Sequence, residues 1–238
     1  MSTTPPVAGA PERAPQVEAM FDQLAPRYDL ANRVLSLGLD QIWRRKAIAE
    51  LGSLGEVLDL CAGTLDLSRM LIDKGASKVI AVDFSAQMLA TGADKFAEDD
   101  PIQIERADAR DLPLEDASVD QIICGFGLRN VPELPRAIAE CARVLRPGGR
   151  LVVLDFFQPA TAISRLLQGT YNRGVVPIIG GAITGFGGAY RYLNQSIDAF
   201  LTADEFVALL AEHDLDASHQ STLPPVASIV TATRVHRD

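Results

Sequence analysis

The chain has 238 residues, of which 47% are hydrophobic and 22% charged, and its formal net charge at pH 7 is -9. This composition is ordinary for a globular protein and excludes collagen-like, coiled-coil and wholly disordered chains. It also argues against a nucleic-acid partner, because binding to a phosphate backbone depends mainly on lysine and arginine.

The first residues mix Pro, Thr, Ala and Glu and lack the apolar run of about 7 to 15 residues that a secretory signal needs. We expect residues 1–16 to be a disordered tail, residues 17–238 to form a single domain, and the protein to be cytoplasmic. Cys61, Cys124 and Cys141 are widely spaced in apolar sequence, which favours small buried side chains over disulfides or a zinc site. No metal is therefore expected.

Helices are predicted first along the chain. Apolar residues recur at helical spacing from Val17 to Tyr28, and Pro26 should break or kink that helix. A second helix is expected over residues 41–51. Together these helices would form an N-terminal cap.

Short apolar runs then alternate with helical stretches. Strands are expected at residues 56–60, 78–83, 102–106, 119–124, 150–154, 217–222 and 228–233. The intervening helices are expected at residues 65–74, after the N-cap Ser85, and at residues 134–145 and 203–213.

Such alternation implies parallel strands joined by right-handed crossovers. We therefore predict an open, doubly wound α/β fold, with a mostly parallel sheet of seven strands whose last two form a hairpin at its edge. Pro147, Gly148 and Gly149 should stop the preceding helix and turn the chain into the next strand.

Residues 155–200 do not fit the alternation and form an expected insertion after the fifth strand. No charged residue lies between Arg173 and Arg191, but the interval contains Pro177 and several glycines, and a membrane-spanning helix wants about 20 mostly apolar residues. The insertion is interpreted as an apolar lid or substrate wall. The alternative is a structural excursion that binds nothing.

Ligands of a doubly wound sheet bind outside the carboxyl ends of the strands. Asp59, Asp83, Asp108 and residues 125–130 fall at such ends. Asp83 lies 20 positions after Gly63, the spacing expected for a carboxylate that binds the two hydroxyls of a ribose. Any cofactor that contains a nucleoside would suit it.

The first turn, residues 59–66, has one glycine, whereas a dinucleotide site needs several to approach a pyrophosphate. Asp59 and Asp66 would repel a diphosphate but attract a sulfonium and an ammonium group. The turn therefore favours S-adenosylmethionine over NAD or FAD. An aspartate at a strand end can equally be a helix cap or a surface charge.

Five runs of sequence resemble, in order, the ubiquinone/menaquinone biosynthesis C-methyltransferase family. They are MFDQLAPRYD at 20–29, VLDLCAGTLDL at 57–67, FGLRNV at 126–131, RVLRPGGRL at 143–151 and YRYLNQSI at 190–197. The third and fifth are the more specific. The resemblance implies a class I methyltransferase with a Rossmann-like sheet, which carries a methyl group from S-adenosylmethionine to a ring carbon of a prenylated benzoquinol or naphthoquinol.

The resemblance also implies roles for individual residues. It puts the cofactor among Asp59, Gly63, Thr64, Asp83, Asp108, Ala109 and Gly125. It puts Arg129, Asn130 and Tyr28 in catalytic positions beside the methyl-accepting ring, and Asp29, Phe126, Tyr190 and Tyr192 around the acceptor. The implied chemistry is an in-line displacement, in which Arg129 stabilises a phenolate or orients a water. Its main structural alternative is a buried ion pair, and for each tyrosine it is packing in a core.

The chain departs from the family pattern at the first turn. Ala62 and Leu65 stand where the family's Gly-Gly-Thr-Gly-Asp has glycines. A positive φ at Leu65 would cost about 1 to 2 kcal/mol, and its side chain must find space beside the cofactor. Residues 224–230 also replace a glycine-containing stretch of the family.

Two other functions stay open from the sequence. One is a methyltransferase for a different small or lipid-like acceptor, and the other is a catalytically silent partner in a biosynthetic assembly. A homodimer and a transient contact with the inner membrane face are also open. Residues 42–46, IWRRK, would suit such a contact, but an ordinary amphipathic helix with a buried Trp43 is the expectation, since the net charge opposes anionic lipid.

Overall fold

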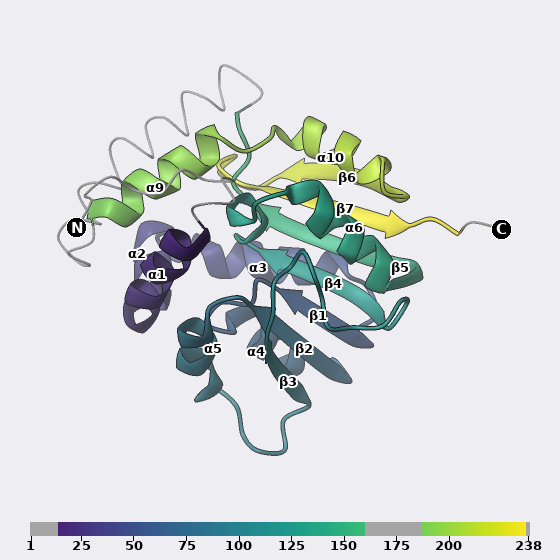
Figure 1. The fold of residues 1–238 in the computed structure, drawn as a ribbon, viewed down its shortest axis with the longest axis horizontal. Helices are drawn as coiled ribbons and strands as arrows, with labels where there is room; N and C mark the ends of the chain where they lie inside the picture. The colour runs from purple at the N-terminus through teal and green to yellow at the C-terminus, as the bar shows by residue number, and fades with distance from the viewer. Residues whose placement is uncertain (1–13, 160–186, 237–238) are drawn as a thin grey trace.

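The computed structural model describes residues 14–159 and 187–236, and within this part of the chain seven strands form one sheet (Figure 1). The strands are β1 (Glu56–Leu60), β2 (Lys78–Asp83), β3 (Ile102–Arg106), β4 (Val119–Gly125), β5 (Leu145–Asp155), β6 (Leu215–Ser221) and β7 (Ser228–Arg234). Their order is β3-β2-β1-β4-β5-β7-β6. Among the described strands β7 alone runs opposite to the direction of the others, which confirms the doubly wound, mostly parallel sheet and its terminal hairpin.

Helices cover both faces of the sheet. On one face α3 (Leu39–Glu50) and α4 (Asp66–Asp73) pack their apolar side chains against β1, β4 and β5. On the other, α6 (Leu134–Val144) and α10 (Ala203–Ala211) bury Ile138 and Phe206 in a second core. The helix α5 (Ala86–Ala93) begins at the predicted N-cap, where Ser85 Oγ accepts a hydrogen bond from the Met88 amide.

The N-terminal cap breaks where the sequence predicts. The helix α1 (Ala14–Leu24) ends before Pro26, a 3-10 turn η2 (Ala25–Arg27) contains that proline, and α2 (Tyr28–Leu35) follows. Proline fixes the backbone and lacks an amide donor, so it starts a new segment. The first helix begins at Ala14, inside the expected tail of residues 1–16, and residues 1–13 lie outside the described residues.

The Pro-Gly-Gly segment is not the expected turn between a helix and a strand. Residues 147–149 lie inside β5, which already begins at Leu145. The pairing with β4 shifts there, from Val119 opposite Leu145 to Gln121 opposite Arg150. The pairing of β5 is therefore irregular at this segment, and its glycine at residue 148 has a φ of +77°.

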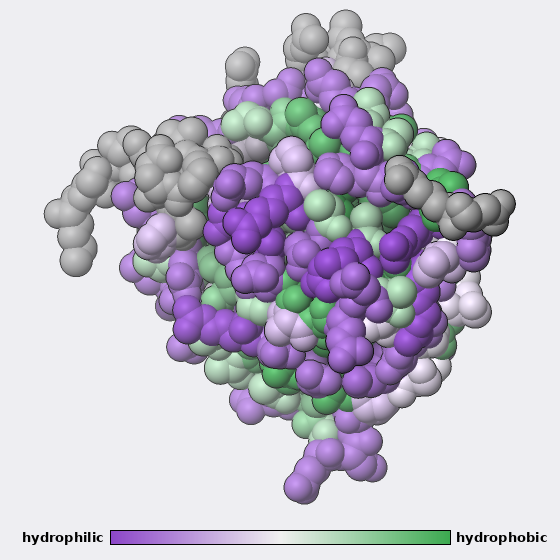
Figure 2. All heavy atoms as spheres, turned by 45° about the vertical axis from the view of Figure 1, so that its right-hand side comes forward, coloured by the Kyte–Doolittle hydropathy of each residue, from purple (hydrophilic) through white to green (hydrophobic). Residues whose placement is uncertain are grey.

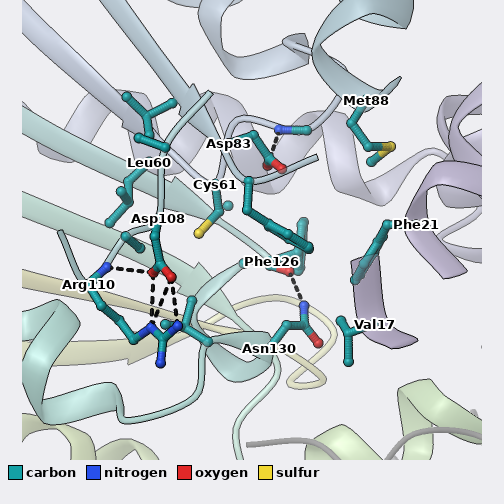
Figure 3. A pocket seen from close by; sticks show the side chains of 18 of the residues that line it. Val17, Phe21, Leu60, Cys61, Asp83, Met88, Asp108, Arg110, Phe126 and Asn130 are labelled. Atoms are coloured by element: carbon teal, nitrogen blue, oxygen red, sulfur yellow. Dashed lines mark hydrogen bonds and ion pairs between the residues drawn. The ribbon is translucent and has the colours of Figure 1, made fainter. Parts of the chain in front are cut away.

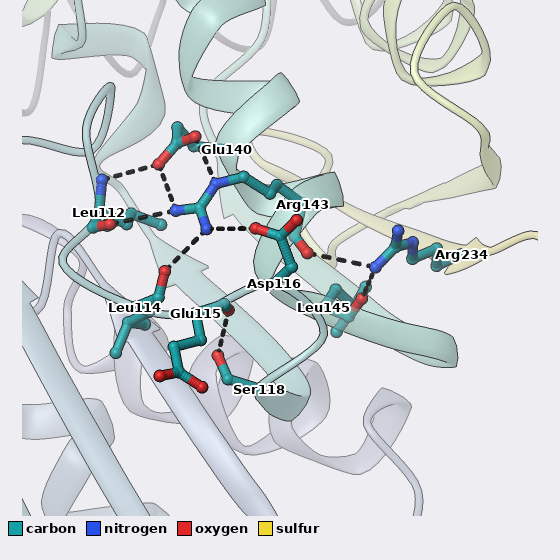
Figure 4. Close-up of polar contacts among 9 residues, drawn as sticks. All are labelled: Leu112, Leu114, Glu115, Asp116, Ser118, Glu140, Arg143, Leu145 and Arg234. Atoms are coloured by element: carbon teal, nitrogen blue, oxygen red, sulfur yellow. Dashed lines mark hydrogen bonds and ion pairs between the residues drawn. The ribbon is translucent and has the colours of Figure 1, made fainter.

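Side chains of α6 hold the long β3–β4 connection against the sheet (Figure 4). Arg143 donates to the Leu114 carbonyl at 2.7 Å and pairs with Glu140 and Asp116. Glu140 in turn accepts the Leu112 amide at 2.8 Å. Because that connection follows Asp108, these bonds fix one wall of the region where ligands are expected.

Residues 42–46 do not form a continuous aromatic and basic patch on the surface. Trp43 is 1% exposed, as the amphipathic-helix interpretation predicts, and Ile42, Arg45 and Lys46 face solvent. Arg44 is buried, contrary to the solvated charge that this interpretation expects. On the face drawn in Figure 2, hydrophilic residues predominate and apolar ones are scattered among them. Within residues 14–159 and 187–236, no helix is both long and apolar enough to cross a membrane.

The expected insertion is described only at its two ends. Residues 155–159 leave β5, and the helix α9 (Gly187–Asp198) leads back toward α10. In Figure 1, α9 lies across the top of the cap helices. Residues 160–186, which include most of the uncharged interval, lie outside the described residues.

Candidate active site

A cleft opens at the carboxyl ends of β1, β2 and β4, where the order of the strands reverses between β1 and β4. This reversal is where doubly wound sheets bind their ligands. The cleft holds about 800 Å³ when its open mouth is included. The predicted residues that line it are Tyr28, Gly63, Asp83, Asp108, Ala109, Gly125, Phe126 and Asn130 (Figure 3).

The turn after β1 brings its backbone to Asp83. Because β1 and β2 are parallel neighbours, the Gly63 amide donates to Asp83 Oδ2 at 2.8 Å, and the Ser85 amide donates to Oδ1 at 2.9 Å. Burial raises the pKa of Asp83 above its ordinary value, and these amide donors oppose the shift. The predicted spacing of 20 residues is thus realised as a direct hydrogen bond at the floor of the cleft.

Leu65 does adopt the left-handed backbone, with a φ of +65°. Its side chain does not face the cleft. It is fully buried in a small core with Ala81 and Leu89, and it approaches Gly92 so closely that a Cβ there would lie 2.7 Å from Leu65 Cγ. The expected conflict with the cofactor is therefore absent, because the leucine fills space between the turn and α5.

Asp59 lies beneath the cleft and does not line it, contrary to its expected place around the cofactor. Its side chain is fully buried, one oxygen accepts the Ser68 hydroxyl at 2.6 Å, and the other has no hydrogen-bond partner among the described residues. Burial raises the pKa of Asp59 to about 7, while the Ser68 bond opposes the shift. The side chain supports the turn from below.

Thr64 and Asp29 also do not line the cleft, and they contact each other. The Thr64 hydroxyl donates to Asp29, which joins the turn to the cap helix α2. The ammonium group of Lys95 donates to Asp29 at 2.7 Å, to Asp66 at 2.5 Å and to the Thr64 carbonyl at 2.7 Å. Sequence reasoning missed Lys95, since nothing in its local sequence distinguishes it from a surface lysine.

Two of the aspartates expected near the cofactor, Asp66 and Asp108, are already paired with cationic side chains. Asp66 is paired with Lys95, and Asp108 accepts bonds from the Arg110 guanidinium, the shortest at 2.7 Å (Figure 3). The Arg110 bonds hold the pKa of Asp108 below its usual range. Arg110 itself lines the cleft, so the attraction of free carboxylates for a sulfonium is weaker than expected from the sequence.

Aromatic side chains from the cap and from α9 meet beside Asn130. The Tyr192 hydroxyl donates to Asn130 Oδ1 at 2.9 Å, and Phe21 packs edge-on against Tyr28, Phe84 and Tyr192. Burial raises the pKa of Tyr28, and it raises that of Tyr192 to about 12. Tyr190 belongs to α9, but its side chain lies outside the described part of the structure.

Arg129, which the resemblance puts beside the acceptor ring, does not line the cleft. Its guanidinium forms a buried ion pair with Asp155 at 2.6 Å and donates to the Phe126 carbonyl at 2.6 Å. Although burial alone would lower the pKa of Arg129, the Asp155 carboxylate raises it above its usual value. Arg129 therefore forms the buried ion pair that the sequence left open as its structural role. Its neighbour Asn130 lines the cleft.

Other residues that line the cleft were not among the predicted site residues. Val17 and Phe21 come from α1, Met88 from α5, and Cys61 from the turn after β1. The helical periodicity of α1 shows which face is apolar but not what covers it. Cys61, expected to be buried, is half-exposed at the cleft, whereas Cys124 and Cys141 are buried as predicted.

Comparison with known proteins places this geometry in a family. The family model of the ubiE/COQ5 methyltransferases matches residues 10–232. The chain is 42% identical over 200 residues to the demethylmenaquinone methyltransferase of Deinococcus radiodurans, covering 82% of this chain and 83% of that protein. It is 36% identical over 231 residues to the ubiquinone/menaquinone biosynthesis C-methyltransferase UbiE of Geobacter sulfurreducens, covering 94% and 90%.

Solved structures share the fold at lower identity. A SAM-dependent methyltransferase from Aquifex aeolicus superimposes with a TM-score of 0.61 at 17% identity, covering 83% of this chain and 92% of that one. Geranyl diphosphate C-methyltransferase from Streptomyces coelicolor, solved with S-adenosyl-L-homocysteine, has a TM-score of 0.62 at 16% identity, covering 82% and 77%. The chain belongs to the ubiE/COQ5 methyltransferase family and is a methyltransferase that depends on S-adenosylmethionine.

Proposed function

We propose that the protein methylates a ring carbon of a prenylated quinol, either demethylmenaquinol or a ubiquinol precursor. The observation that carries this proposal is the wall of the cleft formed by Phe21, Tyr28 and Asn130, with Tyr192 bonded to Asn130. Aromatic rings next to a few fixed polar groups suit a flat quinol with two oxygens. The relatives' names supply the same class of acceptor.

The residues at the floor of the cleft fit the cofactor. The Asp83 carboxylate, anchored by the Gly63 amide, lies at the end of β2, where ribose hydroxyls bind in this class of fold. Gly63 has a φ of +55°, and an added Cβ would lie 3.4 Å from Met88 and 3.9 Å from Tyr28, so a side chain would narrow the cleft. Asp108, Ala109 and Gly125 would complete this side. When bound, S-adenosylmethionine supplies a methyl group on a positively charged sulfur.

The side chains of the protein orient the acceptor and enclose it in the cleft. Burial raises the pKa of Tyr28, so its hydroxyl stays protonated near neutral pH and can donate to a quinol oxygen. The Asn130 oxygen is occupied by Tyr192, while its amide nitrogen makes only a 3.4 Å contact with the Phe126 carbonyl and is available to the acceptor. Positioning of this kind can lower a barrier by roughly 7 to 11 kcal/mol.

Three residues would position other groups without touching the cofactor or the acceptor: Arg129, Asp59 and Thr64. Arg129 holds the 3-10 turn η3 (Leu128–Asn130) against β5, which aims Asn130 at the cleft. Thr64, through Asp29, keeps the cap next to the turn after β1. We assign these three residues to positioning, and we assign acceptor contact to Tyr28, Phe126, Asn130 and Tyr192.

The domain plan follows the same division. We propose one methyltransferase domain, with the cap and residues 155–200 enclosing an apolar acceptor. A prenylated quinol resides in a bilayer, so we infer a cytoplasmic enzyme that touches the inner membrane face transiently. Sedimentation with neutral and anionic vesicles tests this contact, and the net charge of -9 predicts no preference for anionic lipid. The homodimer and the lack of a nucleic-acid partner stay predictions that mass measurement and a DNA-binding assay would check.

The central experiment uses methyl-labelled S-adenosylmethionine and a panel of reduced quinols. We expect the label on a ring carbon of a prenylated naphthoquinol or benzoquinol, located by mass spectrometry. Label on an oxygen or nitrogen, or only on acceptors without a quinol ring, would overturn the proposal. Binding of the cofactor without transfer to any acceptor would point to the silent partner instead.

A further inference from the structure

A second hollow lies beside the cleft, between the start of α6 and the exposed side of α10. Its apolar lining is formed mainly by Leu134, Pro135, Phe200, Leu201, Ala208 and Leu209. It holds about 960 Å³, its open mouth included. We call it the α6–α10 groove.

The groove and the cleft share a wall. Val131 lines both spaces. Of the two residues before it, Arg129 lines the groove and Asn130 lines the cleft. The turn η3 is therefore the partition between the two spaces. The two spaces meet at Val131, so a molecule with its head beside Asn130 and its tail in the groove would cross at this side chain.

The charges around the groove restrict what it can hold. Glu205 of α10 and Glu212, directly after that helix, line the groove, and the Arg129 cation is neutralised by Asp155. Such an edge repels fatty acids and phosphate-bearing lipids. An uncharged hydrocarbon chain is stabilised by moving its apolar surface out of water, and it needs no polar partner.

We propose that the α6–α10 groove binds the acceptor's prenyl chain beyond its first isoprene unit, while the quinol ring lies beside Asn130. This inference rests on the proposed function and names a subsite for its substrate. The ring and the chain then occupy two joined spaces of different chemistry, one with polar groups and one without. The continuity at Val131 makes this chain the occupant, in preference to a free lipid or a second protein.

The test compares two acceptors on the full-length enzyme, one quinol with a single isoprene unit and one with several. Ala208→Glu puts a carboxylate into the groove at an exposed position that can tolerate it. Ala211→Glu adds the same charge to the same helix, at an exposed residue outside the groove lining. We expect Ala208→Glu to raise KM for the long-chain quinol by about tenfold or more and to leave KM for the single-isoprene quinol unchanged.

The control variant should behave as the wild type with both acceptors. Equal effects of Ala208→Glu on the two quinols, or no effect on the long one, would overturn the groove assignment. So would a change from dimer to monomer caused by Ala208→Glu, since the groove would then be a protein interface. If the wild type methylates neither quinol, the proposed function fails separately. Equilibrium binding of the long-chain quinol then decides the groove, because only a site there is weakened by Ala208→Glu and not by Ala211→Glu.

Discussion

Arg129 Nη1 lies 2.6 Å from Asp155 Oδ1, and the two side chains are 8% and 0% exposed. The pair joins the turn after β4 to the last residue of β5. The same guanidinium donates to the Phe126 carbonyl, and the Arg129 amide faces Asp155 Oδ2 at 3.3 Å. These buried contacts therefore help to hold η3 in the orientation that presents Asn130 to the cleft.

Replacing Arg129 by alanine would leave the Asp155 carboxylate buried without its partner. We expect the free energy of unfolding to fall by about 3 to 5 kcal/mol, as measured by chemical denaturation. Arg136→Ala, at an exposed arginine of α6, should cost less than about 0.5 kcal/mol.

The same variant tests whether Arg129 acts through position. If it does, Arg129→Lys, which keeps the charge, should recover part of both the stability and kcat, with little change in the Kd for S-adenosylmethionine. An Arg129→Ala protein as stable as the wild type, but inactive, would instead argue for direct contact with the acceptor.

Asp83→Asn should weaken the binding of S-adenosylmethionine. In the wild type each oxygen of Asp83 accepts one N–H, from Gly63 or from Ser85. The asparagine amide has only one oxygen, so its NH2 group would face the second N–H donor. The variant also loses the negative charge that strengthens hydrogen bonds from ribose hydroxyls. Calorimetry should show a Kd larger by about ten- to a hundredfold. Asp94→Asn, at an exposed aspartate after α5, is the control, and similar Kd values for the two variants would refute the assignment.

Asp59 should make stability depend on pH. Its ordinary pKa of 3.8 is raised to about 7 in the folded protein by burial, so between these values the folded state retains a proton that the unfolded chain releases. Stability therefore falls as pH rises from about 4 to about 7 and levels off above that range.

Asp59→Asn removes this titration and keeps an oxygen for the Ser68 hydroxyl. We expect the variant to gain stability relative to the wild type as pH rises, by on the order of a few kcal/mol between pH 4 and pH 8. Urea unfolding of both proteins at several pH values measures the difference. A constant difference across that range would show that the carboxyl is not buried as described.

Leu65→Gly should destabilise the protein although the family pattern has glycine there. Glycine relieves the left-handed backbone by about 1 to 2 kcal/mol, but removing a fully buried leucine costs about 2 to 5 kcal/mol. The net loss should be about 1 to 3 kcal/mol by chemical denaturation. A more stable variant would mean that the space between the turn and α5 closes after truncation.

Local sequence determined the elements themselves. The strands at residues 56–60, 78–83 and 102–106 have the predicted bounds, and Pro26 separates α1 from α2 as expected. These outcomes depend on short-range features, namely apolar periodicity, a fixed proline φ and an N-cap hydroxyl. The 20-residue spacing of Gly63 and Asp83 also carried over, because parallel neighbours bring successive strand ends together.

Tertiary structure decided which of the marked residues reach the cleft. Arg129 and Asn130 are adjacent in sequence, yet one pairs with Asp155 from the neighbouring strand and the other faces the ligand space. Residues 147–149 became an irregular part of β5, which pairs with β4 on both sides of them. A side chain's direction depends on long-range partners that local pattern does not contain, so the sequence determined the chemistry present and the sheet decided where it is used.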